Sequence, residues 1–173
     1  MPTPIKKISD DKNKELDEKE KEKLVNKALE KKAKRPYQGK GINAITLIRK
    51  ILKAQLKYSK YVAVRSIKKH KTKPLVRIET ITKVPGEKPR SHITNIYAAD
   101  PDYEGKLYNC PAIKVDCDCK DFLYRREVAL TLRNAAEIRH SNGDMPIETN
   151  PQLIPATCKH IFKALLYVVS HKI

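Results

Sequence analysis

Residues 115–122, VDCDCKDF, and residues 156–165, ATCKHIFKAL, carry three of the four cysteines and decide the fold. The first stretch ends an apolar run in which Ile113, Val115, Cys117 and Cys119 alternate with polar residues. Side chains alternate across a β-strand, so the two cysteines are expected to lie on the same face, side by side. The sequence therefore predicts a pair of sulfur atoms at the end of a strand.

The second stretch predicts the start of a helix. Thr157 is the expected N-cap, which places Cys158 and His160 in the first turn. The positive end of a helix favours thiolate over thiol, and so do Lys120 and Lys159, which stand next to the cysteines.

Two donors from a strand end and two from a helix start can enclose a tetrahedral metal ion. The predicted ligands of one Zn²⁺ ion are Cys117, Cys119, Cys158 and His160. Expected distances are about 2.3 Å to sulfur and about 2.0–2.1 Å to nitrogen. Four protein ligands leave no position for water, so the site is expected to be structural and not catalytic.

The alternative is a set of ordinary buried cysteines, because free cysteine is often a core residue. Cys110 lies between Asn109 and Pro111, outside the pattern, and is expected to be a non-ligand thiol at a turn. The remaining histidines have no partner at ligand spacing and are predicted to be surface residues: His70, His92, His140 and His171.

The pattern Cys117-x-Cys119, a gap, and Cys158-x-His160 resembles the SWIM zinc finger, with an apolar strand before the first pair and an apolar helix after the second. The resemblance covers about residues 110–170 and implies a ββα zinc module that binds DNA or protein. The gap of 38 residues is longer than the family usually shows. The CKDF and CKH flanks are also similar to uncharacterised small SWIM-like proteins of tailed bacteriophages.

The composition fits a small domain that needs a bound metal or a disulfide for stability. The chain has 173 residues, no Trp and two Phe, so its core is modest. It shows no hydrophobic signal region and no apolar run of membrane-spanning length. We therefore expect an intracellular protein of the cytoplasm, nucleoid or nucleus, or one inside a virus particle, whose cysteines are metal ligands and not disulfides.

The net charge of +17 is concentrated in the middle of the chain. Residues 35–90 hold 16 Lys or Arg against two acids, Glu79 and Glu87, which indicates an anionic partner such as nucleic acid. The alternative is a solubilising surface in a Lys-rich protein. The residues predicted to contact phosphates, with DNA as the expected partner, are Arg49, Lys50, Lys53, Lys57, Lys60, Arg65, Lys68, Lys69, Lys71 and Lys73. Because most of them are Lys, little sequence specificity is expected.

Three segments are predicted along the chain. Residues 1–34 form a charged arm, helical or disordered, and residues 35–60 form a linker with a basic amphipathic helix. That helix has Asn43 as its N-cap and an apolar stripe of Ile45, Ile48, Leu52 and Leu56. Its basic face is expected to lie on nucleic acid, an acidic membrane or a protein; the alternative is an ordinary surface helix. Residues 61–173 form an α+β domain.

Within that domain, the period-two pattern of residues 61–119 predicts three or four antiparallel strands, with Pro85-Gly86 as a hairpin turn. A helix is predicted over residues 121–140, with Phe122, Leu123, Ala129, Leu132 and Ala136 toward the core. Residues 141–157 are predicted to be a loop, and residues 158–171 the last helix.

Two function classes remain. The first is an accessory protein that binds nucleic acid. The second is a structural component of a large assembly, in which residues 1–60 dock on a protein partner. The sequence has no paired carboxylate motif, no Gly-rich phosphate loop and no nucleophile elbow, so we expect neither an enzyme nor a small-molecule substrate.

Overall fold

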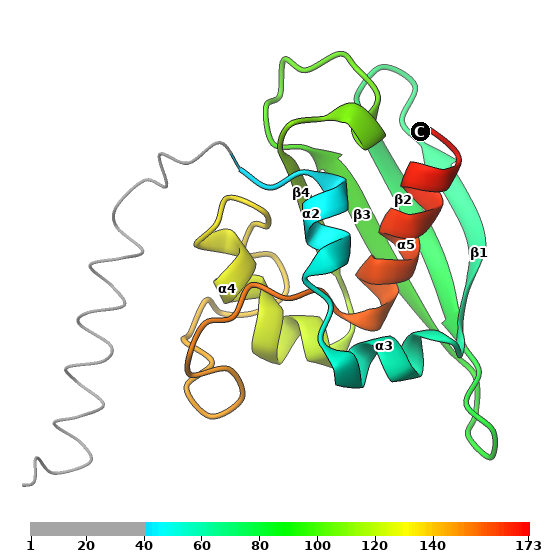
Figure 1. Cartoon of the computed structure of the whole chain (residues 1–173), viewed down its shortest axis with the longest axis vertical. Helices are drawn as coiled ribbons and strands as arrows, with labels where there is room; N and C mark the ends of the chain where they lie inside the picture. The colour runs from blue at the N-terminus through cyan, green and yellow to red at the C-terminus, as the bar shows by residue number, and fades with distance from the viewer. Residues whose placement is uncertain (1–40) are drawn as a thin grey trace, which may run out of the picture. The chain divides into compact units, whose positions relative to one another are not determined.

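A four-stranded antiparallel sheet organises residues 41–173, the part of the chain that the computed structural model describes (Figure 1). The strands follow one another in sequence order across the sheet: β1 (Val62–Lys69), β2 (Leu75–Thr82), β3 (Arg90–Ala98) and β4 (Ile113–Cys117). The predicted α+β class with a small antiparallel sheet is confirmed. The predicted arm of residues 1–34 and the linker up to residue 40 lie outside the described residues.

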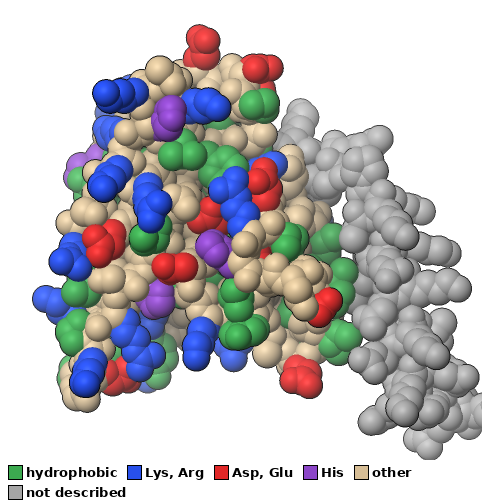
Figure 2. Space-filling model, turned by 180° about the vertical axis from the view of Figure 1, so that it is seen from behind, with side chains coloured by type: hydrophobic (Ala, Val, Ile, Leu, Met, Phe, Trp, Pro, Cys, Tyr) green, Lys and Arg blue, Asp and Glu red, His purple; other side chains and the backbone are tan. Residues whose placement is uncertain are grey.

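The register gives the sheet one covered and one open face. Ile78 lies opposite Thr94, and Ile96 lies opposite Val115, so these four side chains share the buried face. The other face carries more exposed residues such as Arg77 and Glu79. Figure 2, which views the molecule from behind, shows basic and acidic side chains mixed on that side.

The β2–β3 hairpin turns where the sequence predicted. Pro85 and Gly86 form the turn, and the N–H of Glu87 donates to the carbonyl of Val84 at 3.1 Å. Gly86 has a φ of +80°, a left-handed conformation in which a side chain would be strained. A glycine at this position therefore allows the hairpin to close.

Three helices lie over the covered face (Figure 1): α2 (Ala44–Arg49), α3 (Lys53–Ser59) and α5 (Lys159–Ser170). The prediction of one continuous helix in this N-terminal stretch is wrong, because Leu52 is extended (φ −77°, ψ 149°) and separates α2 from α3. The predicted Asn43 cap is confirmed, since its side chain accepts the N–H of Thr46 at 2.8 Å.

Of the predicted apolar stripe of that helix, Ile48 packs against the core, but the other three positions are exposed. Ala44 and Leu47 are buried, whereas Ile45 and Leu56 are 47% and 49% exposed. Packing of Leu47 against α5 has overridden the local periodicity, since tertiary contacts outweigh the small energies of helix propensity. Residues 42–48 thus contribute to the same core as residues 61–173.

The segment between β4 and α5 is less helical than predicted. A π-helical turn, η2 (Phe122–Arg126), leads into α4 (Glu127–Thr131), and the helical structure ends there instead of reaching residue 140. The reason is that Ala135 leaves the helix: its carbonyl accepts the N–H of Val115 at 2.9 Å, along the outer edge of β4. A short 3₁₀ turn, η1 (Leu107–Asn109), precedes β4.

The carboxylate of Glu127 fixes the segment that follows. This side chain is fully buried and accepts the backbone N–H groups of Arg139, His140 and Ser141 at 2.8–2.9 Å. Burial alone would raise the pKa of Glu127, but these hydrogen bonds outweigh it and hold the pKa below its ordinary value. We name this arrangement the Glu127 anchor.

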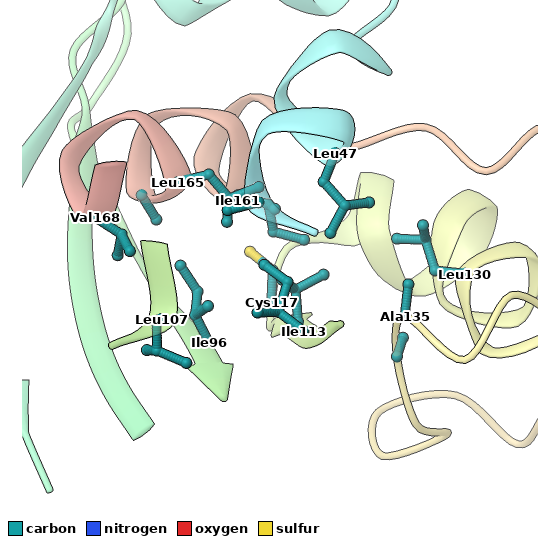
Figure 3. Close-up of a cluster of buried hydrophobic side chains, with 14 of the residues drawn as sticks. Leu47, Ile96, Leu107, Ile113, Cys117, Leu130, Ala135, Ile161, Leu165 and Val168 are labelled. Carbon is teal, nitrogen blue, oxygen red and sulfur yellow. The ribbon is translucent and has the colours of Figure 1, made fainter. Parts of the chain in front are cut away.

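The core lies between the sheet and α5. Figure 3 shows Ile96, Ile113, Ile161 and Leu165 converging there, with the sulfur of Cys117 among them. Within residues 41–173, no helix is both long and apolar enough to cross a membrane.

Candidate metal centre

Four potential ligands meet where β4 ends and α5 begins. Cys117 is the last residue of β4, Cys119 follows two residues later, Cys158 is the N-cap of α5, and His160 lies in its first turn. All four are buried, and their ligand atoms lie within 4.8 Å of one another. The predicted convergence of a strand end with a helix start is therefore confirmed. We name this group the Cys₃His cluster.

The strand side of the cluster is held in place by Asp118. Its Oδ1 accepts the N–H of Ile93 at 3.1 Å and lies 2.9 Å from Nδ1 of His92. These contacts fasten the chain to β3 just beyond β4. The sulfur of Cys119 then accepts the N–H of Phe122 at 3.4 Å, which favours its thiolate form.

The helix side begins with a sulfur cap. The Sγ atom of Cys158 accepts the N–H of Ile161 at 3.4 Å, so Cys158 and not the predicted Thr157 caps α5. Thr157 is fully buried one residue earlier, and its hydroxyl has no hydrogen-bond partner. A sulfur at the N-cap accepts an otherwise unsatisfied N–H and stays directed at the cluster.

His160 presents one nitrogen to the cluster and the other to the sheet. Its Nδ1 lies 3.9 Å from Sγ of Cys117, and its Nε2 lies 3.0 Å from the hydroxyl of Thr82. With Nε2 protonated, the ring donates to Thr82 and leaves the lone pair of Nδ1 for a metal. Sequence reasoning missed Thr82, although its position after Val76, Ile78 and Thr80 on one face of β2 was a usable signal.

His92 corrects a second expectation. It was predicted to be a surface residue, but its side chain is only 23% exposed and its ring centroid lies 4.3 Å from that of His160. Its parity with Thr94 and Ile96 on β3 places it on the covered face. His70, His140 and His171 are exposed, as predicted.

The electrostatics of the cluster suit a bound cation. Burial raises the pKa of Cys117 and of Cys158 well above the ordinary value. The pKa of Cys119 is lowered, first because the Cys117 and Cys158 side chains hydrogen-bond its sulfur. One thiolate is thus stabilised by two thiols, and ionising all three sulfurs in this buried place needs a positive ion.

The donor set fits a metal ion. Three sulfurs and one imidazole suit a tetrahedral centre, in which donor atoms stand about 3.8 Å apart for sulfur bonds of about 2.3 Å. The Cys117 Sγ to His160 Nδ1 distance of 3.9 Å is a few tenths of an ångström above the roughly 3.6 Å expected for one sulfur and one nitrogen ligand. The residues that would hold the ion are the four predicted from the sequence.

Cys110 lies outside the cluster. It is buried, its thiol donates to the carbonyl of Ala112 at 3.0 Å, and burial raises its pKa. These contacts give it a packing role at the turn before β4.

The ten basic residues predicted to contact phosphates are not brought together at one place. Those up to residue 60 lie on or next to α2 and α3, and those from residue 68 onward lie at the far end of β1 and in the β1–β2 turn (Figure 1). Arg65 lies between the two groups, in the middle of β1, whose eight residues span roughly 23 Å. All except Lys50 are exposed.

No protein-family model, curated protein or solved structure matches this chain.

Proposed function

We propose that this chain is a non-enzymatic protein whose fold is stapled by one Zn²⁺ ion and which binds nucleic acid through the phosphate backbone. The observation that carries the zinc assignment is the buried Cys₃His cluster. Zn²⁺ favours four tetrahedral sulfur and nitrogen ligands, and a closed set of four leaves no place for a reacting water. The placement of the ligands, at a strand end and a helix start, agrees with the resemblance to the SWIM zinc finger.

Elemental analysis tests the zinc assignment. The purified chain should carry about one zinc ion, as one tetrahedral site requires. Cys117→Ser and His160→Ala should lose it, whereas the matched variant Cys110→Ser should retain it, because Cys110 lies outside the cluster. Loss of zinc from Cys110→Ser together with retention in His160→Ala would show that the ligand set is wrong.

Charge supports the nucleic-acid part of the proposal. Residues 35–90 carry 16 basic side chains against two acidic ones, and from residue 41 onward the basic ones are largely exposed. Lys is a compact charge without the planar fork of Arg, so it contacts phosphates well and reads bases poorly. Weak dependence on base sequence follows.

A salt titration tests this part. If five or six phosphate contacts form with duplex DNA, log K should fall with log salt with a slope of about −5. Replacing Lys50, Lys53, Lys57 and Lys60 by Gln should flatten that slope by up to ~4 and leave the zinc content unchanged. A binding signal that does not change with salt would remove nucleic acid from the proposal.

A second candidate function is a structural component of a large assembly, such as a phage particle, with a protein partner. Exposed apolar side chains on and beside α2 and α3 favour it: Ile45, Leu52 and Leu56 are 47%, 37% and 49% exposed. In this case the chain from its native cells should sediment with a particle. Deleting residues 1–34 should release it into the soluble fraction without changing its zinc content.

A further inference from the structure

A cleft opens directly beside the Cys₃His cluster. Its volume is about 440 Å³, and its floor includes Cys119, Cys158 and His160. The walls come from α3, the β3 side of the β2–β3 hairpin, the segment after β4 and the start of α5, which meet at the lower end of the fold in Figure 1. An adjoining hollow of about 150 Å³ shares several of these wall residues and extends along the hairpin to Lys88.

Basic side chains converge on this cleft. Arg90 comes from the hairpin, Lys120 from the segment after β4, and Lys159 from α5. Arg90 is largely exposed, and its ion-pair contact is a long one of 3.9 Å to Glu87. These cations are therefore available to an anion in the cleft.

The acidic side chain that lines the cleft, Asp121, is matched by other cations. It lies 3.4 Å from Arg125 and 3.7 Å from Arg126. A zinc ion bound to three thiolates and a neutral imidazole adds a single negative charge. Positive charge remains in excess over the cleft.

An aromatic ring completes the arrangement. Tyr58, on α3, lines both hollows and is 47% exposed, and the Nζ atom of Lys159 lies 5.9 Å from the centre of its ring. Single-stranded nucleic acid is bound by grooves that combine backbone-contacting cations with an aromatic face on which a base stacks. A paired duplex does not offer the face of an internal base to such a ring.

We propose that this cleft binds single-stranded nucleic acid, with Arg90, Lys120 and Lys159 at the phosphates and Tyr58 stacked on a base. The inference rests on the proposed nucleic-acid function and makes it more specific. It moves the principal contact surface to the metal end of the fold. The cations of the β1–β2 turn, at the opposite end, line neither hollow beside the cluster.

The test measures fluorescence anisotropy of labelled oligothymidylate and oligouridylate, about 12 nucleotides long, and of a duplex of equal length. The parent protein should bind the single strands more tightly than the duplex at the same salt concentration. The triple variant Arg90→Gln/Lys120→Gln/Lys159→Gln should flatten the single-strand salt slope by about 2, at about 0.7 per lost contact. Tyr58→Leu should weaken binding by roughly 5- to 150-fold and leave the slope unchanged, because it removes stacking and no charge.

Matched control variants show whether binding depends on the charges at the cleft or only on the total charge of the protein. Lys68→Gln/Lys69→Gln/Lys71→Gln removes the same charge from the opposite end and should change the slope little. Because Lys120 and Lys159 stand beside metal ligands, the pair Lys88→Gln/Arg90→Gln repeats the test on the hairpin alone. It should flatten the slope by about 0.7 through Arg90, and by about 1.4 if Lys88 in the adjoining hollow also contacts a phosphate. Zinc content is measured for every variant.

The possible failures are distinguishable. A parent protein that binds no oligonucleotide at low salt overturns the proposed function and this inference together. Nucleic-acid binding that the control triple weakens as much as the cleft triple leaves the proposed function standing and overturns the cleft. Tighter binding to the duplex than to the single strands overturns the assignment to single strands. So does a Tyr58→Leu variant whose affinity for oligonucleotides equals that of the parent.

Discussion

The Cys₃His cluster and the Glu127 anchor are two buried polar sites that hold the long segment between β4 and α5, and they are satisfied differently. At the anchor the chain itself supplies three N–H donors at 2.8–2.9 Å to one carboxylate. At the cluster three buried thiols lie together, and burial disfavours the ionised forms of Cys117 and Cys158. The chain thus completes one site alone, whereas the other could be completed by a metal ion.

This difference separates two sources of stability. A carboxylate satisfied by backbone donors forms when the local chain folds and needs no other component. A metal site contributes its binding energy to folding only when the metal is supplied. Removing each contribution separately should show how much stability each site supplies.

Removal of the metal should have the largest effect. Binding of structural zinc is worth on the order of 10 kcal/mol in small modules, which is comparable to the whole stability of a domain. Excess chelator should therefore abolish or strongly lower the thermal transition followed by circular dichroism, and added Zn²⁺ should restore it. An unchanged melting curve in chelator-treated, zinc-free protein would show that the cluster is not a staple.

Glu127→Gln should have the next largest effect. The amide keeps the shape but places an N–H group against backbone N–H donors and removes the charge, at a cost of about 2–3 kcal/mol. Urea unfolding measures the loss, with the exposed Glu148→Gln as the matched control. The zinc content should stay that of the parent. Loss of zinc from Glu127→Gln would show that the two sites are not independent.

Thr82→Val should weaken the cluster without removing a ligand. The hydroxyl that faces Nε2 of His160 is lost, and such supporting hydrogen bonds are worth about 10- to 100-fold in metal affinity. Competition with a chromophoric chelator measures the affinity. Thr80→Val is the matched control, since Thr80 is buried on the same face of β2 but bonds the carbonyl of His92. Equal losses in both variants would assign the effect to packing alone.

The smallest expected effect concerns an exposed carboxylate on the open side. Hydrogen bonds from Lys114 and Arg139 lower the pKa of Glu137 from 4.5 to about 2. A lowered folded-state pKa gives stability that is present above pH 4.5 and is lost as the pH falls toward 2. The stability difference between the parent and Glu137→Gln should therefore be largest at neutral pH and shrink on acidification, as urea unfolding at several pH values would show. A difference that grows in acid would contradict the assignment.

The features predicted correctly from the sequence depend on local patterns. Strand alternation placed Cys117 on the same face as Ile113 and Val115, and a cap expected at Thr157, one residue too early, placed Cys158 and His160 at the start of a helix. The residues that sequence reasoning missed depend on contacts between distant segments. Thr82 and His160 are 78 residues apart in sequence, and only the sheet register brings β2 to the cluster.

The wrong helix boundaries have the same cause. The periodicity of residues 42–60 allowed a continuous helix, but the chain is extended at Leu52, and Leu47 of α2 packs in the core that α5 shares. Similarly, hydrogen bonding of Ala135 to the edge of β4 ended a helix that composition would have extended. In both cases the competing contact lies far away in the sequence.

Both ends of the segment between Cys119 and Cys158 are held at the cluster, so this segment can accept inserted residues. The cluster fixes both ends of these 38 intervening residues, and the Glu127 anchor fixes their first part. Lengthening a surface loop whose ends are already held costs only about 0.6 kcal/mol for each doubling of its length. The stretch after Gly143 is thus a natural position for added sequence, such as an epitope or a second binding module, that leaves the rest of the molecule intact.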